Sequence, residues 1–166
     1  MTTREDHIAR RLRADLEHKV RTYGRAVMWI FPADDSADPL NDTFAYTVGN
    51  APKLPELLVI GMQDKNAKWV LNAASDALAK TLAAAGPIPP QGMALDLGGK
   101  CPVYLVPASD EAKKDMTFAA TNWHGGTDYP LMQVVMPDQH GRFPWHDDCD
   151  WPYGRVRLWG PAPVAH

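Results

Sequence analysis

Hydrophobic residues recur along this chain with a spacing that alternates between helical and strand-like. Apolar side chains lie four residues apart from Ile8 to Val20, which predicts an amphipathic helix over residues 4–22. A similar apolar face predicts two further helices, over residues 64–85 and residues 110–123.

Short apolar runs, bounded by proline, glycine or polar loops, predict about six strands. They lie at residues 26–31, 43–48, 57–60, 93–97, 103–106 and 131–136. Most of these strands follow one another without an intervening helix, which favours an antiparallel or mixed sheet over a parallel one. We therefore predict an α+β fold with about three helices and about six short strands, whose sheet could curl into a barrel.

The length of the chain fits a single domain with its own core. It has 166 residues, of which 45% are hydrophobic and 22% are charged, close to the globular average. No internal repeat and no long linker divides it. We predict a charged amphipathic helix in residues 1–24, followed by a single α+β domain in residues 25–166.

The charge pattern argues against a nucleic-acid partner. The net charge is -3, and the basic residues between Arg4 and Arg25 alternate with acidic ones, which is typical of a solvated helix face. The N-terminus has no apolar signal region, and no apolar run approaches the length of a membrane span. Cys101 and Cys149 are too few for a disulfide framework, so we expect a cytoplasmic protein with reduced thiols.

Three sequence blocks carry a resemblance to a known family. They are residues 44–49 (FAYTVG), residues 55–61 (PELLVIG) and residues 133–145, which contain QVV, PD and GRFPW. In this order and spacing they resemble the bacterial and phage family called domain of unknown function 4262. The resemblance implies a small α+β domain and assigns no activity. This chain has Leu54 and Asn50 where the family usually has histidine and leucine; if that histidine is catalytic elsewhere, the activity is lost or changed here.

The C-terminal stretch, residues 140–159, combines tryptophan, arginine, histidine and aspartate at unusual density. Aromatic faces can stack on a planar ligand, and arginines bind carboxylate or phosphate groups in a bidentate manner. This composition indicates a site for an anionic or nucleotide-like small molecule. The alternative is that the tryptophans close the core and the arginines pair with nearby aspartates.

Our candidate ligand-binding residues combine this stretch with a strand of the first family block and with the junction between the predicted third helix and the loop that follows it. They are Tyr46, Trp123, His124, Arg142, Trp145 and His146. Glu56 lies at the start of a predicted strand. Its carboxylate is either solvated or lines a site, and the sequence leaves both possibilities open.

Catalytic and metal-binding motifs are incomplete. His140, His146 and Cys149 do not follow a standard zinc spacing, so we predict no metal site. The aspartates around Cys149 should raise the pKa of its thiol and make it a poor nucleophile. The sequence identifies no cofactor and leaves enzymatic activity undecided.

Three functions remain open. The first is an intracellular domain that binds a small molecule. The second is an enzyme with a cofactor pocket, because consecutive short strands are also found in flavin-binding split barrels. The third is a protein-interaction module, which would dock a partner through its N-terminal helix. Homo-oligomerisation is also open.

Overall fold

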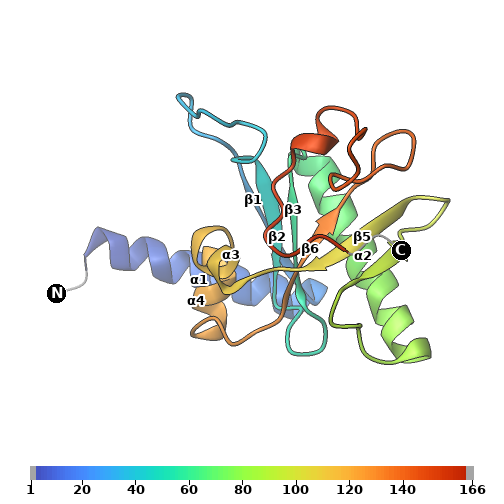
Figure 1. Cartoon of the computed structure of the whole chain (residues 1–166). Coiled ribbons are helices and arrows are strands. Elements are labelled where there is room, and N and C mark those ends of the chain that lie inside the picture. Colours follow the sequence, from blue (N-terminus) through green and yellow to red (C-terminus); the bar gives the residue numbers. More distant parts are fainter. Residues whose placement is uncertain (1–2, 164–166) are drawn as a thin grey trace.

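The computed structural model describes residues 3–163, and within them the chain forms four α-helices, a six-stranded sheet and a short 3₁₀ turn (Figure 1). The helices are α1 (Arg4–Tyr23), α2 (Asp64–Ala85), α3 (Asp110–Asp115) and α4 (Phe118–His124). The strands are β1 (Ala26–Ile30), β2 (Phe44–Val48), β3 (Glu56–Ile60), β4 (Met93–Asp96), β5 (Pro102–Pro107) and β6 (Leu131–Val135). The 3₁₀ turn is η1 (Tyr153–Arg155).

The sheet is mixed and open. Its strand order is β1-β2-β3-β6-β5-β4, and every neighbouring pair is antiparallel except β3 and β6, which run parallel with Glu56 opposite Leu131. The predicted α+β class with about six strands is confirmed. The sheet does not close into a barrel, because β1 and β4 lie at its two opposite edges.

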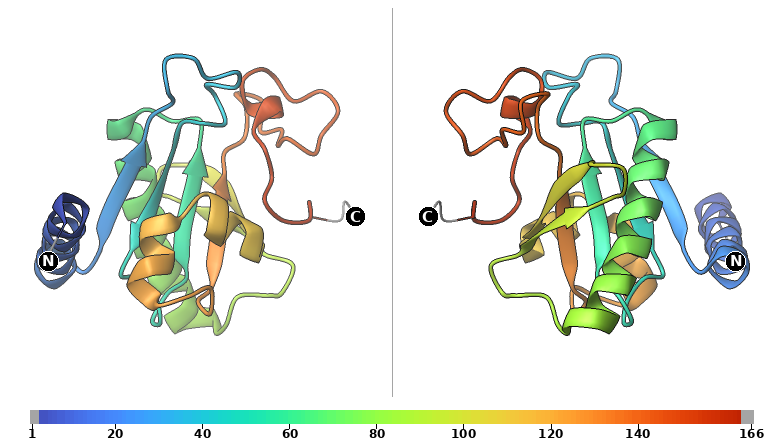
Figure 2. Two further views of the ribbon diagram at one scale, coloured as in Figure 1. Left: turned by 90° about the vertical axis from the view of Figure 1, so that its left-hand side faces the viewer. Right: turned by 90° about the vertical axis from the view of Figure 1, so that its right-hand side faces the viewer.

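Helices cover both faces of the sheet (Figure 2). On one face, α2 packs Leu71 and Leu78 against side chains such as Leu57 of β3. On the other face, α1, α4 and the C-terminal Trp159 pack around side chains such as Leu58. Successive residues of a strand point to opposite faces, so a strand covered on both sides is apolar throughout, as the LLVI run of β3 is.

The prediction of one continuous helix over residues 110–123 is wrong. The structure breaks it after α3, and α4 starts at Phe118. Thr117 is fully buried and its hydroxyl bonds to the hydroxyl of Tyr129 at 2.8 Å, while its backbone leaves the helical conformation. The tertiary contact of this side chain therefore outweighs a helical periodicity that continues through the break.

The N-terminal helix α1 is anchored by its C-terminal half. Leu16 is buried, whereas Ile8 and Leu12 are 58% and 43% exposed. A Cβ atom at Gly49, which has a φ of +101°, would lie 2.7 Å from a methyl group of Val20. Glycine at position 49 therefore allows α1 to approach the end of β2 closely. Among the described residues, no helix is both long enough and apolar enough to cross a membrane.

Candidate functional site

The parallel pair β3 and β6 creates a crevice at the carboxyl ends of both strands. After β3 the chain enters α2 on one face of the sheet, and after β6 it returns along the opposite face to place Trp159 there. In open sheets with parallel strands, ligands bind where neighbouring connections diverge in this way. The end of the sheet at which β3 and β6 finish is therefore the expected location of a site.

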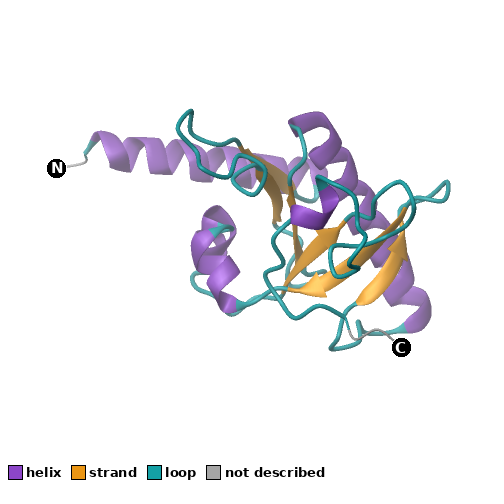
Figure 3. Ribbon diagram, turned by 45° about the horizontal axis from the view of Figure 1, so that its top comes forward, coloured by secondary structure: helices purple, strands orange, loops and turns teal. Residues whose placement is uncertain are grey.

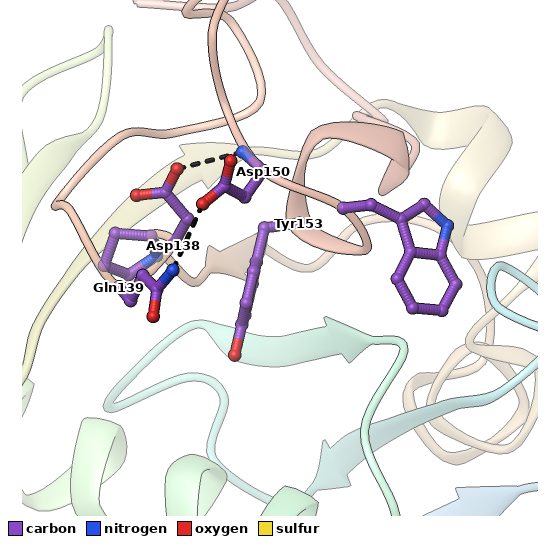
Figure 4. A pocket seen from close by; sticks show the side chains of 6 residues that line it. Asp138, Gln139, Asp150 and Tyr153 are labelled. Carbon is purple, nitrogen blue, oxygen red and sulfur yellow. Dashed lines mark hydrogen bonds between the residues drawn. The ribbon is translucent and has the colours of Figure 1, made fainter.

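Three adjoining hollows lie at this end of the sheet, and we call them together the Trp151 cleft. The first, of about 510 Å³, is lined by Pro137, Asp138, Gln139, Asp150, Trp151 and Tyr153 (Figure 4). The second, of about 200 Å³, shares Tyr153 with the first and reaches the start of α2 at Gln63 and Asn66. The third, of about 400 Å³, shares Trp151 with the first and is lined by apolar residues including Phe31. Trp151 and Tyr153 thus form walls common to more than one hollow.

A hydrogen-bond network centred on Asp138 holds the loop after β6. Its Oδ1 accepts from the backbone N–H groups of His140 at 2.8 Å and Arg142 at 2.9 Å. Its Oδ2 accepts from Arg142 Nε and from the backbone N–H of Asp150, each at 2.9 Å. The Arg142 guanidinium also contacts Asp148 at 3.0 Å and Asp150 at 3.2 Å. Arg142 is therefore shared among three carboxylates.

These contacts set the charge state of Asp138. Desolvation alone would raise the pKa of this carboxyl group, but the hydrogen bonds from the backbone N–H groups of Asp150, Arg142 and His140 and from the Arg142 side chain lower it well below its ordinary value of 3.8. The charged form is the one that organises the loop.

A folded-state pKa below the unfolded value adds stability that is present above the unfolded pKa and lost as pH falls through the folded one. For Asp138 this loss should begin below about pH 4. We expect the difference in free energy of unfolding between the parent protein and Asp138→Asn to shrink from pH 5 to pH 2. The matched control is Asp147→Asn, at an exposed position of the same segment. A difference for Asp138→Asn that stays constant over this range would contradict the assignment.

The other two candidates of the C-terminal stretch lie beside β5 rather than in the cleft walls. Trp145 stacks on Phe143 with ring centroids 4.8 Å apart, and both rings meet the edge of Tyr104 in β5. His146 accepts a hydrogen bond at Nδ1 from the backbone N–H of Phe143 at 2.8 Å. In this arrangement Trp145 and His146 shape the loop.

The remaining three candidates lie around α4. The hydroxyl of Tyr46 accepts from the backbone N–H of Ala119 at 3.1 Å, and desolvation raises the pKa of this phenol. The ring of Trp123 lies under the guanidinium of Arg13, 4.4 Å from it. His124 occupies the C-terminal turn of α4. The six predicted ligand-binding residues thus form two groups, and the structure does not bring them into a common cavity.

Comparison with known proteins places this architecture in a family. A family model described as "Domain of unknown function (DUF4262)" matches residues 19–150. The chain belongs to this family. No curated protein and no solved structure gives a significant match. The DUF4262 match includes the whole sheet and the Asp138 network, and it ends immediately before Trp151.

A second polar centre of this DUF4262 chain surrounds Glu56, which is fully buried at the start of β3. Its carboxylate accepts from Thr47 Oγ1 at 2.8 Å and from three successive backbone N–H groups, those of Gly49, Asn50 and Ala51, at 3.0–3.3 Å. It also contacts Nε2 of His124 at 2.6 Å. Every oxygen of Glu56 is therefore occupied, and the carboxylate positions the loop between β2 and β3.

Asn50, which follows directly after Gly49, extends this network. Its Nδ2 donates to Ser75 Oγ at 3.0 Å, and its Oδ1 accepts from Arg25 Nε at 2.9 Å. The sequence signal for this centre was a charged residue directly before a buried apolar run. The partner His124 could not be inferred because it comes from an element far along the chain.

The pKa of the Cys149 thiol in this DUF4262 domain lies above its ordinary value, and burial contributes more than its acidic neighbours. Burial raises the pKa of its thiol, Asp138 and Asp150 raise it further, and Arg142 opposes them. Within residues 3–163, no group of three or more His, Cys, Asp and Glu side chains is arranged to hold a metal ion.

Proposed function

We propose that this DUF4262 domain binds a small molecule in the Trp151 cleft. The observation that carries the proposal is the position of Trp151, which is 74% exposed and yet lines two adjoining hollows. Ligand sites are typically concave and lined by aromatic side chains with a few polar groups. A ligand that covered this indole would remove a large apolar surface from water.

The charges of the cleft favour a neutral or cationic ligand. Arg142, the residue that suggested an anionic ligand in the sequence, is already paired with Asp138, Asp148 and Asp150. The first hollow is lined by two carboxylates and one amide, those of Asp138, Asp150 and Gln139, and by no basic side chain. The Asp138 side chain is buried and fully hydrogen-bonded, so the partly exposed carboxylate of Asp150 is the one that a ligand can reach. Together with the aromatic rings of Trp151 and Tyr153, it suits an aromatic group that carries a positive charge or hydrogen-bond donors. The ligand that we propose therefore differs from the anionic class.

The open sheet also bears on the enzyme alternative. The hypothesis of a flavin enzyme depends on an analogy with split barrels. The sheet of this chain is open instead, with β1 and β4 at its two edges. A binding function needs only the cleft, and for that reason we prefer it.

The proposal predicts a selective effect of Trp151→Ala. We expect benzyltrimethylammonium, which joins an aromatic ring to a quaternary ammonium group, to bind more tightly than the neutral benzyl alcohol, and benzoate to bind most weakly. Trp151→Ala should lower the affinity for the cation by about tenfold, because it removes one aromatic face from the site. The melting temperature should change little, since the indole is exposed. Isothermal titration calorimetry and a thermal melt measure the two effects.

The matched control is Trp69→Ala, which removes a 55% exposed tryptophan on α2 that lines none of the three hollows. It should leave the affinity unchanged. Tighter binding of benzoate than of the cation, or an equal loss in the two tryptophan variants, would reject the proposal. Native mass spectrometry of the freshly purified protein would add the mass of any ligand that it retains.

A further inference from the structure

A fourth hollow lies at the opposite end of the parallel strand pair, where β3 and β6 begin. It has a volume of about 450 Å³ and lies between the end of α2, the start of β6 and α3. We call it the proline groove. Its lining residues are Pro52, Lys53, Leu54, Pro55, Leu82, Pro87, Ile88, Pro89, Pro90, Pro107, Ala108, Lys113, Pro130, Leu131 and Met132. Because it meets the other end of the strands, it is separate from the Trp151 cleft.

The walls of the proline groove are apolar and preformed. Leu54, Leu82, Ile88 and Met132 contribute aliphatic side chains, and seven of the lining residues are prolines. Proline has a fixed φ and no backbone N–H, so these walls lose little conformational freedom on binding and offer few donors. Such a surface suits an aliphatic chain.

The charged side chains that line the groove are two lysines, one of which is paired with Asp110. Lys53 and Lys113 are among the lining residues, and no acidic side chain is. The side chain of Lys113 is only 10% exposed. Its ammonium group donates to Asp110 Oδ1 at 3.0 Å and to the carbonyl oxygen of Thr127 at 2.9 Å. An ammonium group has three N–H donors, so one donor has no oxygen or nitrogen acceptor among the described residues, and the ammonium also lies 5.2 Å from the centre of the Tyr129 ring.

We propose that the proline groove binds a medium-chain aliphatic carboxylic acid. The alkyl chain lies against Leu54, Ile88 and Met132. The carboxylate is held by Lys53 at the exposed rim, and the N–H of Lys113 that neither Asp110 nor Thr127 accepts contributes from the groove wall. The apolar walls accommodate the alkyl chain. Lys53 is a cation that no carboxylate in the lining balances, whereas the charge of Lys113 is shared with Asp110. This proposal does not depend on the ligand of the Trp151 cleft.

Decanoate is the probe, and decan-1-ol and decylamine supply the same chain without the negative charge. We expect decanoate to bind saturably in calorimetry and at least about tenfold more tightly than decan-1-ol, because its carboxylate accepts a charged hydrogen bond from a lysine. Decylamine should bind most weakly. In methyl-detected NMR, decanoate should shift the signals of Leu54, Ile88 and Met132.

Lys53→Met and Leu54→Glu test the groove without altering the buried Lys113 pair, and both should weaken decanoate binding. Lys80→Met makes the same charge change at an exposed position of α2 that does not line the groove, and it should bind normally. Decanol binding as tightly as decanoate would overturn the proposal. So would the absence of saturable binding, or NMR shifts confined to Leu40 and Met136 of the Trp151 cleft.

Discussion

Replacing Glu56 with glutamine should lower the free energy of unfolding by about 3 kcal/mol or more. The carboxylate accepts hydrogen bonds from Thr47 and from three consecutive backbone N–H groups while it is fully buried. A glutamine side chain is nearly the same size, but one of its two terminal atoms is an NH₂ group. That group would face N–H donors and leave at least one of them unpaired in a buried site, and the contact with His124 would lose its charge.

Urea denaturation of the variant measures this loss. Glu111→Gln is the control, since it makes the same substitution at an exposed position of α3 and should change the stability by less than about 0.5 kcal/mol. If Glu56→Gln cost as little as the control, the carboxylate would not be the element that holds the β2–β3 loop. A lower free energy of unfolding with an unchanged dependence on urea concentration would show that the whole domain is destabilised.

The elements of the fold were predictable because local patterns determine them. Buried strands such as β3 appear as continuous apolar runs between proline and glycine, and α2 shows an unbroken apolar face. The order of the strands was not predictable, since the pairing of β3 with β6 joins segments far apart in the chain. The same reason explains the break at Thr117. Its cause is a hydroxyl contact with Tyr129, which the helical pattern of residues 110–123 does not reveal.

The site was predictable only in part, for an equally physical reason. The composition of residues 140–160 drew attention to the segment that carries Trp151. The alternative that its arginines pair with nearby aspartates describes Arg142 as the structure has it. Composition does not tell which aromatic side chains are buried. Trp159 closes the core, Trp145 packs on Phe143, and Trp151 is the one that lines the cleft. Exposure of a tryptophan depends on the path of the loop around it.

That path depends on Gln133, and the variant Gln133→Met should lower the free energy of unfolding by about 2–3 kcal/mol. Gln133 is fully buried in the central strand β6. Its Nε2 donates to the carbonyl oxygen of Arg157 at 2.8 Å, and its Oε1 accepts from the backbone N–H of Trp159 at 2.9 Å. Methionine fills a similar volume but cannot donate, and its sulfur accepts only weakly. The buried N–H of Trp159 would lose its partner.

Hydrogen exchange tests this directly, because the amide of Trp159 should exchange faster in Gln133→Met than in the parent protein. Gln91→Met, at an exposed position before β4, is the matched control for the substitution itself. The segment that Gln133 anchors also carries Trp151 and Tyr153, so affinity for benzyltrimethylammonium should fall together with the protection of Trp159. Protection of the Trp159 amide could instead fall while the affinity stayed unchanged. The contact of the C-terminal segment with Gln133 would then not be what holds the walls of the cleft. The Asp138 network and the hydrogen bond from Asn41 to Arg155 would hold them.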